Sequence, residues 1–237
     1  MKRYLIFSLI SLFLSVLFTL AVIFIDVRPE GLIGTNIGLA SLNLSVASFL
    51  DRNLLFYKIA DYLGYLCFVI VAFYGIQGLI QLIRKKSIFR VDKRILTLGG
   101  IYLIIGIIYV VFNNIFVLNY RPVFIGAELE SSFPSSHTLM ALVVCVTSFF
   151  SLKHYIKNAR LAKALNVCTV LLGLAIVTFR VFSGTHWITD IIASALYSVT
   201  LIFAFLALNY KSRESVESHE QNPSSAKPSS KHASSHR

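Results

Sequence analysis

Two polar clusters in this 237-residue chain hold side chains that are suited to phosphate chemistry. The first cluster contains Arg121 and His137, and the second contains Arg180 and His186. A guanidinium group can bind phosphate oxygens through two parallel hydrogen bonds, and it keeps its charge at any working pH. An imidazole can attack phosphorus or donate a proton to a leaving oxygen. Together with an acidic partner, these residues could carry out phosphoryl transfer without a metal ion.

His186 and Asp190 stand four residues apart at the predicted start of a helix, so their side chains share one face of it. A carboxylate in this position can accept the Nδ1 proton of the imidazole and leave Nε2 free as a nucleophile. Taken alone, a hydrogen-bonded structural pair would explain the spacing equally well. Because ionisable groups at membrane depth mark functional sites, we predict that His186 is the nucleophile and that Asp190 supports it.

The sequence Pro134-Ser135-Ser136-His137 marks the start of another apolar helix. Proline and serine at a helix start leave backbone N–H groups free, and such groups can bind an anion. We interpret the segment as a phosphate cradle, although an ordinary helix cap would use the same residues. His137 stands beside the cradle and is a candidate proton donor to the leaving oxygen.

The chain around these clusters is far more apolar than a soluble domain. It is 56% hydrophobic and 14% charged, and its mean hydropathy is +0.74, whereas a soluble domain is about one quarter charged. This composition excludes a soluble enzyme and predicts membrane spans of about 20 residues each. The net charge of +11 lies in short basic runs between apolar stretches, which indicates membrane orientation and no nucleic-acid partner.

Six apolar runs are long enough to cross a bilayer as helices, which predicts an all-α, polytopic integral membrane protein. The runs cover residues 4–25, 54–83, 95–118, 135–152, 161–182 and 188–210. Residues 1–53 are expected to form the first helix and a segment at the membrane interface. Residues 54–210 are expected to form a five-helix core with the polar clusters, and residues 211–237 a disordered tail.

The basic residues predict the orientation of the chain in the membrane. All but five of the 22 Lys and Arg residues lie at the N-terminus, in residues 84–94, in residues 153–163 or in the tail. Because such an excess marks the cytoplasmic side, we expect both termini in the cytoplasm and the catalytic loops on the outer face. Lys58 and Asp61, near the outer end of the second span, are interpreted as a local ion pair or as side chains reaching the interface.

The clusters resemble the motifs of the type-2 phosphatidic acid phosphatases, the membrane relatives of bacterial acid phosphatases and vanadium haloperoxidases. The family's third motif, Ser-Arg-x5-His-x3-Asp, is matched by Arg180, His186 and Asp190, with Phe179 in the serine position. Its second motif, Pro-Ser-x-His, is intact at residues 134–137. The resemblance covers residues 95–210 approximately, and the six-helix count agrees with the membrane branch of the family.

The first motif of the family, Lys-x6-Arg-Pro, is incomplete in this chain. Arg121 and Pro122 are present, but Asn114 stands in the lysine position. A missing cation can cost about 10²–10³ in rate if nothing replaces it, although Asn114 can still donate a hydrogen bond. The resemblance implies two groups of site residues. The catalytic group is His186, Asp190 and His137, and the phosphate-binding group is Arg121, Arg180, Ser135, Ser136 and Asn114.

What the resemblance implies is a lipid phosphatase of the cell membrane that uses no metal or other cofactor. His186 would attack phosphorus, His137 would protonate the departing group, and water would then release phosphate from the phosphohistidine. The expected substrate is a lipid phosphomonoester or diphosphate of the undecaprenyl diphosphate or phosphatidic acid type. The expected partners are this lipid phosphate and the membrane lipid, and the oligomeric state is left open.

Three alternatives are kept beside this hypothesis. A phosphotransferase would pass the phosphoryl group to another lipid or sugar in place of water. A weakly active relative would bind lipid phosphates without turning them over quickly, because Asn114 replaces the lysine. A transporter or channel would also have six helices, but it should carry charges near the middle of several spans, whereas the charged residues here lie at one end.

Overall fold

The protein is all α-helical in the computed structural model, which describes residues 2–210. Its α-helices are α1 (Lys2–Phe24), α2 (Ala40–Ala47), α3 (Leu54–Lys85), α4 (Lys93–Val110), α5 (Ser136–Tyr155), α6 (Ala159–Phe182) and α7 (Ile188–Asn209). Short 3₁₀ turns cover Leu32–Gly34 and Ile88–Arg90, and a π-helical turn covers Val111–Ile115. The predicted all-α fold is confirmed. The tail predicted for residues 211–237 lies outside the described residues.

Six helices of the described chain are long and apolar enough to cross a membrane, as predicted. They are α1, α3, α4 with its π turn, α5, α6 and α7. The predicted third span, 95–118, extends too far, because the helix ends in the π turn and Phe116 has non-helical backbone angles. The helix therefore ends at Ile115, and Asn113 and Asn114 stand in its last turn.

The burial pattern of α1 is the reverse of that in a soluble bundle. Its buried residues are small and polar, including Ser8 and Ser15, whereas Phe13 is 63% exposed. The Ser8 hydroxyl donates to the backbone carbonyl of Thr200 in α7 at 3.0 Å. Small polar residues at a helix interface allow close packing and pair polar groups away from lipid. The apolar residues of α1 are thus left on the outside, where lipid is the solvent.

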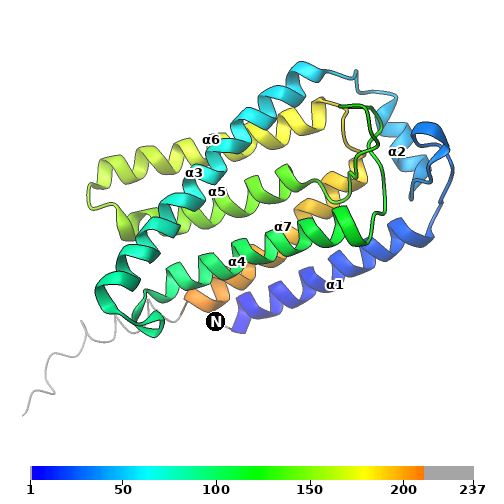
Figure 1. Ribbon diagram of the computed structural model, residues 1–237. Helices are drawn as coiled ribbons and strands as arrows, with labels where there is room; N and C mark the ends of the chain where they lie inside the picture. The colour runs from blue at the N-terminus through cyan, green and yellow to red at the C-terminus, as the bar shows by residue number, and fades with distance from the viewer. Residues whose placement is uncertain (1, 211–237) are drawn as a thin grey trace, which may run out of the picture.

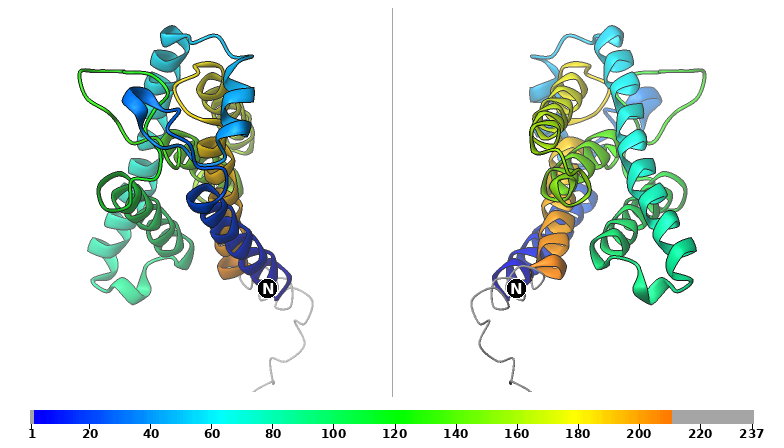
Figure 2. Two further views of the ribbon diagram at one scale, coloured as in Figure 1. Left: turned by 90° about the vertical axis from the view of Figure 1, so that its right-hand side faces the viewer. Right: turned by 90° about the vertical axis from the view of Figure 1, so that its left-hand side faces the viewer.

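The remaining helices pack around α5, which is the most enclosed of the six spans. It lies against α6, α7 and α3, and Figure 1 shows it inside the bundle. Leu139 and Val143 of α5 pack with Tyr74 of α3 and Phe205 of α7 in one apolar cluster. Figure 2 shows the α3–α4 hairpin diverging from the α1–α7 pair toward the N-terminal end of the molecule.

The segment between α1 and α3 covers the start of α7 (Figure 1). The Asn43 amide donates to the Thr189 hydroxyl at 3.0 Å, and its Oδ1 accepts from the Thr189 backbone N–H at 3.2 Å. The backbone at Gly38 lies so close to Val22 that only a glycine fits, because a Cβ there would overlap the carbonyl group of Val22. Ile37 and Trp187 belong to one buried cluster. The segment predicted to lie at the membrane interface therefore also supports the loop before α7.

The two polar clusters lie at one end of the bundle, in the α4–α5 and α6–α7 loops and in the helix turns next to them (Figure 1). We expect this end to face outward. A membrane-impermeant maleimide should then label Glu128→Cys, in the α4–α5 loop, in intact cells. It should label Lys157→Cys, in the α5–α6 loop, only after the cells are opened. Both positions are exposed.

The unaltered chain gives the background in this experiment, because its three cysteines lie within the spans. Labelling of Lys157→Cys in intact cells, with Glu128→Cys protected, would reverse the predicted orientation.

Candidate active site

The starts of α5 and α7 are tied to each other by hydrogen bonds. The backbone N–H of Ser135 donates to the carbonyl of Asp190 at 3.3 Å. The Ser194 hydroxyl donates to the carbonyl of Ser135 at 2.9 Å. His137, in the first turn of α5, and His186, just before α7, are therefore brought to the same place although they are far apart in the sequence. Both line one cavity.

The hydrogen-bond partners of His186 show which of its two ring nitrogens carries the proton. Its Nε2 lies 3.2 Å from Nη1 of Arg121, and its Nδ1 lies 3.1 Å from the carbonyl oxygen of Ser132. A guanidinium group can only donate, so Nε2 must accept, and Nδ1 carries the proton that the carbonyl accepts. The lone pair of Nε2 is thus on the side of the imidazole that meets Arg121. This is the form of the ring that a nucleophile requires.

Asp190 does not hold His186 in the way that the sequence predicts. Its Oδ2 lies 3.6 Å from Nδ1 of His186, which is too long for a hydrogen bond. The carboxylate instead accepts from the side-chain amide of Asn119 at 3.2 Å and from the backbone N–H of Trp187 at 3.0 Å. Because Asp190 lies in the first turn of α7, its side chain turns back to cap the helix. The Ser132 carbonyl orients the imidazole in its place.

The surroundings of His186 keep its imidazole neutral. Burial, together with the positive charges of Arg121 and Arg180, lowers the pKa of His186 well below its ordinary value. A histidine with a lowered pKa loses its proton at a lower pH than usual, so Nε2 keeps its lone pair throughout the neutral range. The group that the sequence predicts to be the nucleophile is therefore in its reactive form at physiological pH.

The two arginines are placed differently. Arg121 lines the cavity, and its Nε lies 2.9 Å from Oε2 of Glu130. Arg180 is fully buried and does not line the cavity. Its Nη2 lies 2.9 Å from Oδ1 of Asp61, and its guanidinium lies over the ring of Tyr57 at 4.8 Å. Nε and Nη1 of Arg180 have no hydrogen-bond partner among the described residues. Buried donors without a partner are costly, and an anion would satisfy them.

The serines of the second cluster are also placed differently. Ser136 lines the cavity, and its hydroxyl lies 3.5 Å from Nδ1 of His137. Ser135 does not line the cavity, because its side chain is fully buried and forms a 3.0 Å hydrogen bond with the Thr138 hydroxyl. Of the two predicted phosphate-binding serines, only Ser136 is thus brought to the cavity with His137.

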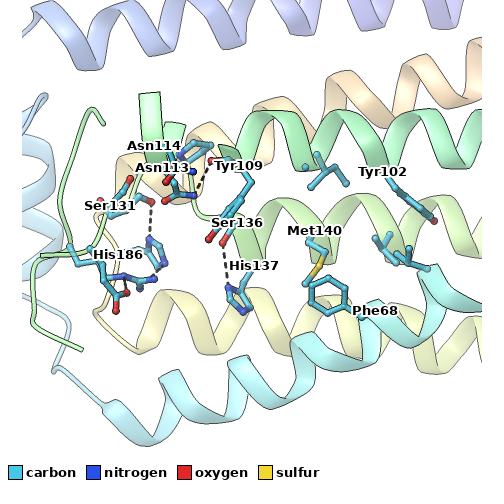
Figure 3. A pocket seen from close by; sticks show the side chains of 18 residues that line it. Phe68, Tyr102, Tyr109, Asn113, Asn114, Ser131, Ser136, His137, Met140 and His186 are labelled. Atoms are coloured by element: carbon cyan, nitrogen blue, oxygen red, sulfur yellow. Dashed lines mark hydrogen bonds and ion pairs between the residues drawn. The ribbon is translucent and has the colours of Figure 1, made fainter. Parts of the chain in front are cut away.

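Asn114 is exposed and lines the same cavity from the π turn after α4, next to Asn113. Figure 3 shows both amides on the side of the cavity that faces His186 and Ser136. π turns are frequent at functional sites, because they re-aim the side chains at a helix end. Among the described residues that line the cavity, Arg121 is the only one with a permanent positive charge.

The cavity has a volume of about 620 Å³ and two chemically distinct parts. His186 and His137 lie at its polar end, whereas Phe68 and Met140 lie toward the other end (Figure 3). Arg121 belongs to the polar end, because it contacts His186. The walls away from the polar end are mostly apolar side chains from α3, α4 and α5: Phe68, Val71, Tyr102, Ile105, Met140 and Val144. The cavity therefore leads from the charged residues to an apolar region between spanning helices.

Sequence reasoning missed four residues that contact the site. The sequence predicts that Asp61 pairs with Lys58 or reaches the interface, but its Oδ1 lies 2.9 Å from Nε2 of His137 and 2.9 Å from Nη2 of Arg180. The other three are Tyr57, Asn119 and Ser132. An acidic residue in an otherwise apolar span was the available signal for Asp61. Within residues 2–210, no group of three or more His, Cys, Asp or Glu side chains could hold a metal ion.

Comparisons with known proteins agree with this geometry. The PAP2 superfamily matches residues 62–214, which include all three motif segments. A comparison with curated proteins finds no match. Among solved structures, the chain is similar to one described as the first transmembrane PAP2 type phosphatidylglycerolphosphate phosphatase from Bacillus subtilis. The TM-score is 0.56 at 17% identity, over 86% of this chain and 96% of that one, which shows a shared fold.

The hydrogen bonds of Asp190 lead to a prediction about stability. Asn119→Leu keeps the size of the buried side chain but removes the amide that donates to the carboxylate and accepts from the backbone N–H of Gly38. An unsatisfied buried acceptor costs about 1–3 kcal/mol, so the free energy of unfolding in detergent should fall by that amount. Asn113→Leu is the matched control, because its amide bonds only a carbonyl of its own helix. Equal destabilisation by both variants would contradict the role given to Asn119.

Proposed function

This chain belongs to the PAP2 superfamily, and from this premise we propose that it is a lipid phosphatase of the membrane. The proposal rests on the cavity, which has a polar end and apolar walls. One end presents Nε2 of a neutral His186 beside Arg121, and the walls beyond are apolar and belong to spanning helices. A ligand that fills both parts has a phosphate group and a hydrocarbon chain, which describes a lipid phosphate.

In the proposed mechanism, Nε2 of His186 attacks phosphorus while the P–O bond to the lipid breaks. Arg121 and the free donors of Arg180 neutralise the phosphoryl oxygens, where negative charge develops. His137 gives a proton to the leaving oxygen. Water then attacks the phosphohistidine, the N–P bond breaks, and inorganic phosphate leaves. The Ser132 carbonyl keeps the proton on Nδ1 of His186 and thereby stabilises the charged imidazole that forms.

The lipid substrate is proposed from the structural neighbour and from the expected orientation of the site. A lipid phosphomonoester is supported by the structural neighbour, which is described as a phosphatidylglycerolphosphate phosphatase. A polyprenyl diphosphate, such as undecaprenyl diphosphate, would suit an outward-facing site, because a carrier lipid used outside the cell must be dephosphorylated there. We therefore propose both classes as test substrates, with the active site on the outer face and both termini in the cytoplasm.

The first test is phosphate release by the purified chain in detergent with a chelator present. The panel contains phosphatidic acid, phosphatidylglycerophosphate and undecaprenyl diphosphate. We expect release from at least one lipid and a loss of more than about 10³-fold in His186→Ala, because the attacking nitrogen is gone. His154→Ala is the control, since this histidine lies in the last turn of α5, at the other end of that helix. No release from any lipid, or full activity in His186→Ala, would overturn the proposal.

The position of Asn114 leads to a second test. Asn114→Lys places a permanent cation in the cavity that Arg121 and His186 line, so kcat/KM should rise by about 10-fold or more if phosphate binding is limiting. Asn114→Met has a side chain of similar length without the charge and should give no increase. If the natural chain is inactive and only the lysine variant turns over, the chain is a lipid-phosphate-binding relative. Equal effects of lysine and methionine would show that this position does not reach the phosphate.

A further inference from the structure

Asp61 of α3 lies between two predicted site residues that come from different parts of the chain. Its Oδ1 is 2.9 Å from Nε2 of His137, in α5, and 2.9 Å from Nη2 of Arg180, in α6. One carboxylate oxygen thus joins the predicted proton donor to a buried guanidinium. Asp61 precedes the segment that the PAP2 superfamily matches, which begins at residue 62.

Two other residues near the start of α3 support this contact. A Cβ on Gly64 would lie 2.9 Å from Cδ2 and 3.4 Å from Nε2 of His137, so only a glycine lets the imidazole lie against the helix. Tyr57 lies one turn before Asp61, and its ring packs under the guanidinium of Arg180 at 4.8 Å. The first turns of α3 therefore form a third side of the site, in addition to the two loops.

The contact with Asp61 also determines which nitrogen of His137 can donate a proton to the substrate. Nε2 is held by Asp61, whereas Nδ1 lies 3.5 Å from the hydroxyl of Ser136, a residue that lines the cavity. The charged groups that act on His137 from the packed elements are Arg180, Arg121 and Asp61, and neutral His186 also faces it. Asp61 is the anionic member of this set, so it is the group that can stabilise a protonated His137.

We propose that Asp61 is the positioning residue of the general acid: it binds Nε2–H of His137 and aims Nδ1–H at the leaving oxygen. The inference rests on the proposed phosphatase function and adds a residue to it. When the P–O bond breaks, its electron pair stays on the leaving oxygen, which takes the proton from Nδ1. His137 becomes neutral and keeps its hydrogen bond to Asp61. In the second step, Nδ1 accepts a proton from the attacking water.

A purely structural role of Asp61 would predict a different result from a role through the general acid. An alkoxide leaving group needs a proton, whereas a nitrophenolate leaves without one. General-acid catalysis raises the rate about 10²–10⁴-fold, and it does so only for the substrate with an alkoxide leaving group. A carboxylate that merely holds Arg180 would affect the binding and turnover of both kinds equally. The dependence on the leaving group therefore separates the two roles.

The experiment measures kcat/KM of the full chain on two substrates that differ in the leaving group, because kcat/KM reports the steps up to formation of the phosphohistidine and not its later hydrolysis. One is a lipid alkyl phosphate, and the other is a nitrophenyl phosphate that carries an alkyl chain. Asp61→Asn should lower kcat/KM about 10²-fold or more on the alkyl phosphate and by less than about threefold on the nitrophenyl phosphate. His137→Ala should show the same dependence, and adding Asp61→Asn to it should cause little further loss, because both act through one group.

Gly64→Ala is a second variant, which keeps the carboxylate but pushes the imidazole away from it. It should lower kcat/KM about 10-fold on the alkyl phosphate alone. Lys58→Met is the matched control: it removes an exposed charge from α3 one turn before Asp61, and both rates should stay within about twofold. Because Gly64→Ala leaves the charge of Asp61 intact, it tests the geometry even if Asp61→Asn proves too unstable to purify.

The outcomes distinguish this inference from the proposed function. If the natural chain releases phosphate from neither substrate, the phosphatase proposal fails. If the natural chain is active and Asp61→Asn loses the same factor on both substrates, Asp61 only supports Arg180, and the positioning role is wrong. Selective loss on the alkyl phosphate in both Asp61→Asn and Gly64→Ala supports the inference.

Discussion

The buried carboxylate of Asp190 joins the segments from which the site is built. It accepts from Asn119 of the α4–α5 loop and from the backbone of Trp187, while the carbonyl of the same residue accepts from Ser135 at the start of α5. Each oxygen of a fully buried carboxylate needs a hydrogen-bond donor, so these contacts leave the segments around Asp190 little freedom to move. The position of His186 follows, because its Nδ1 donates to a carbonyl in a loop that this network holds.

The membrane explains why the polar residues of the site lie at one end of the bundle. Within the hydrocarbon layer every backbone group must be paired, so the spans are regular helices with small polar residues turned inward. The irregular backbone of residues 116–135 and 183–187 lies at the helix ends, and the segment with α2 covers part of it. The cavity then extends from these loops between α3, α4 and α5, so its walls are the apolar faces of spans.

The charges of the site are arranged in pairs. Arg121 is paired with Glu130 and Arg180 with Asp61, which offsets part of the cost of bringing two guanidinium groups together. The pairs are not equivalent, because the Glu130 side chain is 44% exposed and Arg180 is entirely enclosed. In the proposed function a phosphate would meet Arg121 at the cavity wall and the free donors of Arg180 behind it. Asn114 contributes an amide where the family motif has a cation.

Apolar run length and short residue spacings are local properties, so six spans, the boundaries of most helices and the superfamily motifs could be predicted from the sequence. It also predicted that His137 and His186 would meet. The packing of the helices was needed to show that Ser132 orients His186, that Ser135 does not line the cavity and that Asp61 contacts His137. These contacts join residues far apart in the chain, and they depend on how each helix is rotated and shifted against its neighbours. No local pattern records that rotation, so an acidic residue in an apolar span could be noticed in the sequence but not assigned its partners.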